Sequence, residues 1–147
     1  MINLQVAFPE KQADGREILR YRIFNPDGIS RAIEGNPSVE QLVAKILLTD
    51  PNTDLFTPSA GAGMRKIATR PVTAQSLNTR KSEIMLAVLR CQEQIISSQA
   101  GWDLPPSEKL SELEIVALDY SSNSLTWTVD LEVHMEDGNV ERVLLGV

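Results

Sequence analysis

A strictly alternating segment near the C-terminus constrains the fold more than any other part of the sequence. Between residues 125 and 135, every second residue is apolar and the residues between are polar; the apolar set is Leu125, Trp127, Val129, Leu131, Val133 and Met135. Because successive side chains of a strand point to opposite faces, this pattern predicts a strand with one buried and one solvated face. Other parts of the chain must therefore pack against the apolar face of the sheet that contains this strand.

The segments on either side of this strand predict two further strands. Leu113–Tyr120 is a more continuous apolar run, connected to it through Ser121–Ser124. On the other side, Glu136–Asn139 is typical of a hairpin turn and leads into Val140–Leu145. The C-terminal third is therefore predicted to be an antiparallel three-stranded meander.

An amphipathic helix is predicted earlier in the chain. From Val39 to Leu47, apolar residues recur at i, i+3, i+4, i+7 and i+8, which places them on one helical face. Asn36 or Ser38 can cap its start. Asp50-Pro51 ends it, because the residue before a proline is pushed out of the helical region.

A second helix is predicted from Thr79 to Ala100, with an apolar stripe at Ile84, Val88, Cys91 and Ile95. Both helices need an apolar surface, and the inner face of the meander supplies one. The predicted fold class is α+β, with two main helices packed on the meander and an N-terminal arm or short strand.

The rest of the chain is less regular. Leu4–Phe8 is predicted to be a short strand, and Asn25–Gly28 a turn, so residues 1–36 are expected to form an arm or hairpin. Thr53–Ser76 carries prolines and glycines and is predicted to be a long ordered loop without a regular helix. We expect one domain over 1–147: the arm 1–36, the helices and loop 37–109, and the meander 110–147.

Composition excludes several functional classes. The chain has 147 residues, of which 42% are hydrophobic and 23% charged, with a formal net charge of −6. This acidic balance argues against nucleic acid and against an anionic membrane surface as partners. The single cysteine, Cys91, excludes an internal disulfide framework and a cysteine-based zinc cluster.

No motif in the sequence indicates catalysis or a cofactor. His134, the only histidine, lies in the polar phase of its strand and is predicted to be a solvated cross-strand residue. Cys91 is predicted to be a buried small hydrophobe. Gly61–Lys66 lacks the third glycine of a dinucleotide fingerprint and the Gly-Lys-Ser/Thr ending of a P-loop. Its glycines are expected to permit close backbone approach or positive φ.

Carboxylates cluster at two places in the sequence, but a glycosidase needs two of them across a sugar cleft. The two groups are Glu108, Glu112 and Glu114, and Glu132, Glu136 and Asp137. Acidic residues on solvated strand faces and turns are the expected explanation. The sequence therefore predicts no catalytic residue, no cofactor and no metal site.

The last predicted strand is the main candidate for protein interaction; its residues are Val140, Glu141, Arg142, Val143, Leu144 and Leu145. A strand at the edge of a sheet offers unpaired backbone groups to a strand of another chain. The alternative is that the N-terminal strand Leu4–Phe8 pairs with this edge. The sequence alone does not decide between a free edge and pairing with Leu4–Phe8.

Three consecutive segments carry a family resemblance: Ile46-Leu47-Leu48-Thr49, Asp50–Phe56 and Thr57–Met64. A helix ending in I-L-L-T, a turn, a proline and a glycine-x-glycine loop resemble the baseplate-wedge family of contractile tails. Its members are the gene-twenty-five-like wedge proteins of myophages and their type VI secretion counterparts. An early segment ending in Phe8-Pro9, a long helix and terminal strands follow the same order.

This chain departs from the family pattern at two places. The family turn usually holds Gly-Glu-Arg, where this chain has Asn52-Thr53-Asp54. The family often carries Glu-Pro-Arg before the first terminal strand, where this chain reads Pro105–Leu110. Lys109 stands near the place of that arginine but lacks its planar bidentate fork. The wedge contact at this point is therefore expected to differ.

The resemblance implies a structural protein of the virion, located in the tail baseplate and assembled in the host cytoplasm, that initiates sheath assembly by strand addition. Its partners would be the tail sheath protein, other wedge proteins, and the hub or tail tube. Pro58, Gly61, Gly63 and Lys109 are the further candidate contact residues. Since members are sometimes labelled lysozyme-like, a peptidoglycan-degrading enzyme is the alternative, and a small regulatory binding module is a third.

Overall fold

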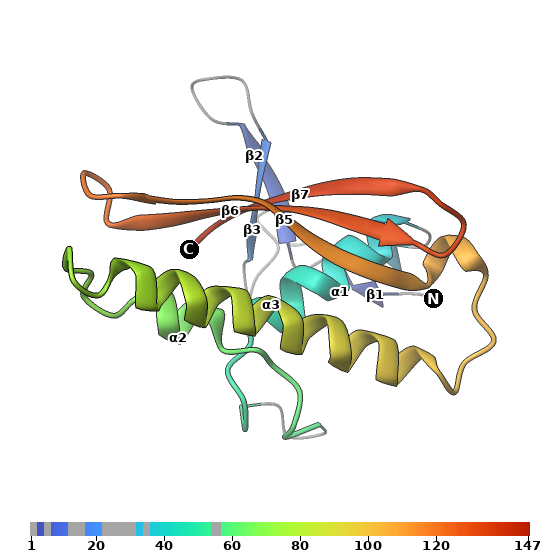
Figure 1. The fold of residues 1–147 in the computed structure, drawn as a ribbon. Helices are drawn as coiled ribbons and strands as arrows, with labels where there is room; N and C mark the ends of the chain where they lie inside the picture. Colours follow the sequence, from blue (N-terminus) through green and yellow to red (C-terminus); the bar gives the residue numbers. More distant parts are fainter. Residues whose placement is uncertain (1–2, 5–6, 12–16, 22–31, 34–35, 54–56) are drawn as a thin grey trace.

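The protein is an α+β structure in which helices cover one face of a C-terminal antiparallel sheet (Figure 1). The computed structural model describes residues 3–4, 7–11, 17–21, 32–33, 36–53 and 57–147, with side chains from residue 39 onward. The helices are α1 (Asn36–Leu48), α2 (Met64–Ala68) and α3 (Leu77–Gln99), with a 3₁₀ turn, η1, at Pro106–Glu108. The strands are β1 (Asn3–Leu4), β2 (Ala7–Lys11), β3 (Glu17–Tyr21), β4 (Ala32–Ile33), β5 (Leu110–Ser121), β6 (Thr126–Met135) and β7 (Val140–Gly146).

The predicted meander is confirmed. Strands β5, β6 and β7 pair antiparallel in sequence order, and Leu131 of β6 lies opposite both Ile115 of β5 and Val143 of β7. The full sheet has the order β2-β3-β7-β6-β5, because β3 adds in parallel to β7 and β2 pairs with β3. A register shift between Ile115 and Ala117 marks a bulge at Val116 in β5.

The core lies between the meander and the helices, as the alternation predicts. Trp127, Val129, Leu131 and Val133 of β6 are fully buried on the helix-facing side. The predicted stripes of both helices are buried against them: Val39, Val43 and Leu47 on α1, and Ile84, Val88, Cys91 and Ile95 on α3. The prediction of two amphipathic helices on one sheet face is therefore confirmed.

The expectation of a long loop without a helix over Thr53–Ser76 is wrong, because α2 lies within it. Met64 and Ala68, four residues apart, are both buried in the core, so a single helical turn and a half can be stabilised by packing. The Ile67 N–H donates to the Gly63 carbonyl at 3.3 Å, which starts the turn directly after the glycine.

The N-terminal segment forms two strand pairs rather than the single predicted strand. The range predicted as one strand, Leu4–Phe8, is divided between β1, which pairs with β4, and β2, which pairs antiparallel with β3. In Figure 1, β2 and β3 cross the meander at a steep angle. The predicted turn Asn25–Gly28 lies outside the described residues.

Cys91 is buried in α3, as predicted. Its thiol lies 3.7 Å from the Val43 carbonyl, to which it can donate a weak hydrogen bond, and burial raises the pKa of the thiol far above its ordinary value. A thiol held in the neutral form is a poor nucleophile. Among the helices that the structure describes, none is long and apolar enough to span a membrane.

Candidate functional site

The predicted interaction strand, β7, is an inner strand of the sheet. It pairs with β6 along its length, and near its end β3 pairs with it in parallel, with Leu19 opposite Leu145. The neighbour is therefore β3 and not the segment Leu4–Phe8. On this side, Leu19–Leu145 is the one register pair between β7 and the described residues.

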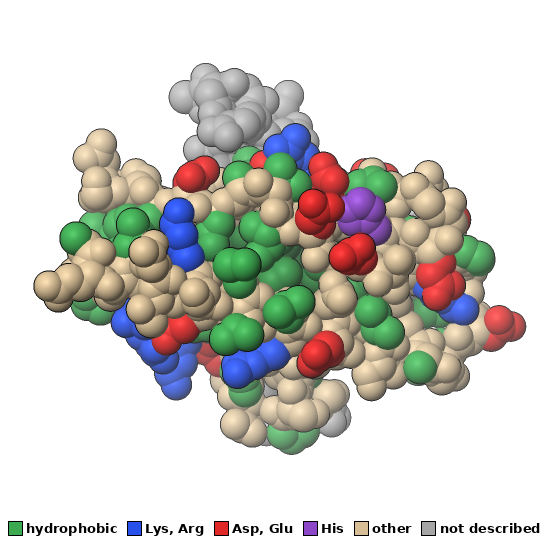
Figure 2. Space-filling model, in the orientation of Figure 1, with side chains coloured by type: hydrophobic (Ala, Val, Ile, Leu, Met, Phe, Trp, Pro, Cys, Tyr) green, Lys and Arg blue, Asp and Glu red, His purple; other side chains and the backbone are tan. Residues whose placement is uncertain are grey.

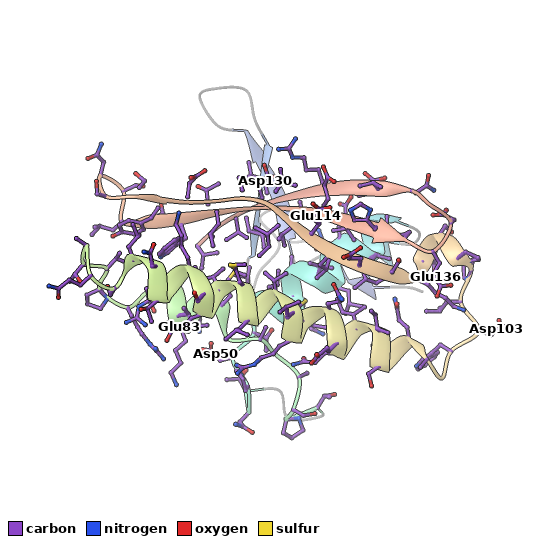
Figure 3. The ribbon with its side chains drawn as sticks, viewed as in Figure 1. Asp50, Glu83, Asp103, Glu114, Asp130 and Glu136 are labelled. Atoms are coloured by element: carbon purple, nitrogen blue, oxygen red, sulfur yellow. The ribbon has the colours of Figure 1, made fainter. Side chains whose placement is uncertain are left out.

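The side chains of β7 serve mainly to hold the sheet together. Val143 and Leu145 are fully buried, and Leu144 is almost so. Arg142 forms a bidentate ion pair with Asp130 of β6, with its Nε donating to Oδ1 at 2.8 Å (Asp130 is labelled in Figure 3). Only Val140, at 47% exposure, offers a large apolar side chain to a partner.

Glu141 of β7 lies near a second carboxylate, Glu40 of α1. Burial raises the pKa of Glu40 from 4.5 to about 7, and the negative charge of Glu141 adds to this shift. An acid whose folded-state pKa is raised favours the native state only while it keeps its proton. Ionisation of Glu40 therefore opposes the packing of α1 against the sheet.

We expect the free energy of unfolding to fall as the pH rises from about 4.5 to about 7, because the native state holds the Glu40 proton in that interval and the unfolded state does not. Glu40→Gln should flatten this part of the stability profile and raise stability at pH 8. Glu141→Gln should lower the pKa of Glu40 only part of the way back toward 4.5, since burial is the larger cause of the shift. Urea unfolding between pH 4 and pH 8 measures this, and an unchanged slope in Glu40→Gln would contradict it.

The loop with Pro58, Gly61 and Gly63 is packed against α1 and α3. Gly61 has φ +119° and exchanges two hydrogen bonds with the Gln94 side chain, at 2.9 and 3.2 Å. The Ala62 N–H donates to the Ile46 carbonyl at 2.8 Å, and the Gly63 N–H donates to the Thr49 carbonyl at 3.0 Å. The loop thus satisfies carbonyl groups at the end of α1.

These bonds support a structural role for the two glycines, in line with the expectation of positive φ, which Gly63 also has at +70°. Pro58 differs, because it is exposed and only its carbonyl is engaged, by the Asn52 N–H at 2.8 Å. Lys109 is half-buried and lies 3.9 Å from the Glu136 carboxylate. Lys109 therefore lies beside the turn that leads into β7, since the Glu136 N–H also donates to its carbonyl at 3.0 Å, whereas Gly61 and Gly63 pack on the helices.

The long edge of the sheet is β5, which sequence reasoning missed. It spans 12 residues, and its only strand neighbour among the described residues is β6. Two glutamines of α3 cover its beginning: Gln99 Oε1 accepts from the Leu110 N–H at 2.9 Å, and Gln92 Oε1 accepts from the Leu113 N–H at 2.8 Å. Beyond Leu113 the edge has no such cover from the part of the chain that is described.

The register fixes which backbone groups of β5 face this edge. Trp127 exchanges both of its backbone hydrogen bonds with Val147, at 2.8 and 2.9 Å, so Tyr120 opposite it directs its N–H and C=O away from β6. Hydrogen bonding alternates along an antiparallel ladder. The backbone N–H and C=O groups of Leu118 and Ile115 therefore also point away from β6. None of these groups has a hydrogen-bond partner among the residues that the structure describes.

Exposed apolar side chains accompany this edge. Val116 at the bulge is 45% exposed, and α3, which packs beside β5, exposes Met85, Leu86, Leu89 and Ile96. Figure 2 shows hydrophobic side chains gathered over the middle of this face of the molecule. An apolar border beside unpaired backbone is typical of a strand-addition site.

Two clefts among the described residues contain carboxylates, one in each. A cleft of about 460 Å³ lies between the Thr57–Ala60 loop and α3 and contains one carboxylate, Glu93. A second of about 200 Å³ contains Glu136 alone. Glu108 is buried in η1, while Glu114 and Glu132 lie opposite each other on β5 and β6. Neither cleft brings together the two carboxylates that glycoside hydrolysis requires.

Comparison with protein-family models finds no matching family for this chain, and comparison with curated proteins finds no relative. The site is therefore defined by its own geometry: the open part of β5 and the apolar side chains of α3 beside it.

Proposed function

We propose that this protein is a structural component of a contractile-tail baseplate wedge that initiates tail sheath assembly by accepting a strand from a sheath subunit. The resemblance of Leu47–Met64 to the wedge family motivates the proposal. The observation that supports strand addition most directly is the open edge of β5 beyond Leu113. The protein acts by binding in this proposal and carries out no reaction.

The structure favours β5 over β7 as the receiving edge for two physical reasons. The incoming strand finds outward-facing backbone at Ile115, Leu118 and Tyr120, and its apolar side chains can cover Val116 and the exposed side chains of α3. At β7, by contrast, β3 already pairs with the strand near Leu145. Burial of apolar surface beside the new hydrogen bonds supplies the affinity.

A matched pair of lysine substitutions tests the choice of edge. Val116→Lys places a charge at the exposed bulge of β5, and Val140→Lys makes the same change at the start of β7, where exposure is nearly equal, 45% against 47%. Edge lysines oppose strand addition because pairing would desolvate them. In assembled particles, we expect Val116→Lys to reduce the fraction of baseplates with sheath roughly tenfold, equivalent to about 1.4 kcal/mol of association free energy.

The control, Val140→Lys, should leave sheath assembly unchanged in the same electron-microscopy counts, and both variants should keep the wild-type circular dichroism spectrum. Loss of sheaths in Val140→Lys alone would indicate that β7, and not β5, receives the partner strand. Normal sheaths in both variants would refute strand addition. Deletion of β7 is a poorer test, since it removes Val143 and Leu145 from the core.

A further inference from the structure

Three potential metal ligands converge on the face of the sheet opposite the helices. Glu132 and His134 project from the same face of β6, and Glu114 lies opposite Glu132 on β5. The His134 Nε2 atom lies 3.6 Å from the Glu114 carboxylate and 3.7 Å from the Glu132 carboxylate. All three ligand atoms lie within 4.8 Å of one another. Figure 2 shows the single histidine among acidic side chains, and Glu114 is labelled in Figure 3.

The His134 Nε2 atom is buried and makes no hydrogen bond to any described residue. Distances of 3.6 and 3.7 Å are too long for hydrogen bonds. They are close to the spacing of ligands around one small cation, because bonds of about 2.0–2.2 Å in a tetrahedral site put neighbouring ligand atoms roughly 3.3–3.6 Å apart. The two carboxylate oxygens lie within 4.8 Å of each other, and the exposed Glu114 side chain can move to close the set around an ion.

We propose that Glu114, Glu132 and His134 bind a divalent transition-metal ion, for which zinc has the best-matched ligand chemistry. One imidazole nitrogen and two carboxylate oxygens are ligands that zinc accepts, and a water molecule completes the tetrahedron. A charge of +2 neutralises both glutamates on a chain whose formal net charge is −6. Because the ligands come from two strands, the ion ties the edge strand β5 to β6.

The competing explanation is a protonated His134 that forms an ion pair with both glutamates. It predicts no affinity for metal beyond that of an ordinary acidic surface. The two explanations separate cleanly because His134 is the only histidine in the chain. A histidine-selective NMR spectrum of the untagged protein therefore reports on this one imidazole.

Calorimetric titration of the untagged full chain with zinc should give one ion per protein, and the His134 ring resonances should shift in the same range of concentrations. His134→Ala should weaken binding at least tenfold, and Glu114→Gln and Glu132→Gln should each weaken it roughly tenfold. Asp119→Asn, an exposed carboxylate further along β5, should leave binding unchanged. At saturating zinc, Tm should rise by about 5 °C.

Binding that survives His134→Ala, or His134 resonances that do not move with zinc, would overturn the site in favour of the ion pair. Circular dichroism of each variant confirms that loss of binding is not loss of fold. Cobalt substitution gives a second readout, because its visible absorption changes when an imidazole enters the coordination sphere. The outcome is independent of sheath assembly.

Discussion

Replacing Trp127 by alanine should lower the free energy of unfolding by about 3–5 kcal/mol, the usual cost of truncating a large aromatic side chain in a core. Trp127 is the largest fully buried side chain among the described residues and lies in β6, the middle strand of the meander. Its ring is 5.0 Å from that of Tyr120 on β5, tilted by 45°, so the substitution also removes an aromatic pair. Urea unfolding followed by circular dichroism measures the loss.

Trp127→Phe is the matched control. The indole N–H is buried without a hydrogen-bond partner among the described residues, so phenylalanine removes an unsatisfied donor while keeping a ring beside Tyr120. We expect a loss of less than about half that of alanine. Equal losses in the two variants would show that packing of the aromatic ring contributes little at this position.

Replacing Gly61 by alanine should destabilise the protein by about 3 kcal/mol or more, from positive-φ strain and overpacking together. A Cβ atom at this position would lie 2.6 Å from the Thr49 carbonyl oxygen, a backbone atom that cannot rotate away. Relief of the contact would pull the loop from α1 and break the pair of hydrogen bonds with Gln94. Chemical denaturation measures the effect.

Gly138→Ala separates strain from collision. Gly138 also has a positive φ, +86°, but a Cβ there would meet nothing within 4 Å. The conformational penalty alone, about 1–2 kcal/mol, should therefore remain. If the two glycine variants lose equal stability, close backbone approach does not explain the need for glycine at position 61.

Local patterns predict the central elements correctly, because their periodicity is strong over many residues. The alternation that ends at Met135 becomes β6, and the stripe from Ile84 to Ile95 becomes the buried face of α3. Helix α2 is missed because five residues cannot show a convincing period. Two buried side chains, Met64 and Ala68, stabilise it through tertiary packing.

The order of strands in the sheet is less accessible to sequence reasoning. The chain ends in the meander, so its last strand is the natural candidate for an edge. Pairing of Leu19 with Leu145 places that strand inside the sheet, and it joins residues more than a hundred positions apart. No local signal specifies such a contact. The true long edge, β5, follows only from the full strand order.

The cluster at His134 illustrates the same limit for side chains. Its polar phase is correctly predicted, but the expectation of a simply solvated residue misses Glu114, which the register of β5 and β6 brings within reach. That register includes the bulge at Val116, and no residue type in the segment predicts a bulge there. Sequence spacing alone cannot place Glu114 beside His134.

The glutamine side chains of α3 also set the length of anything that pairs with β5. Gln92 already occupies the outward N–H of Leu113, so an added strand must stop there unless that bond breaks. The open part runs from Glu114 to Ser121 and, at about 3.3 Å per residue, measures roughly 26 Å. A partner should therefore contribute a segment of about eight residues. A longer segment would form no further backbone hydrogen bonds with β5. Helix α3 therefore limits the length of the partner strand in addition to packing against the core.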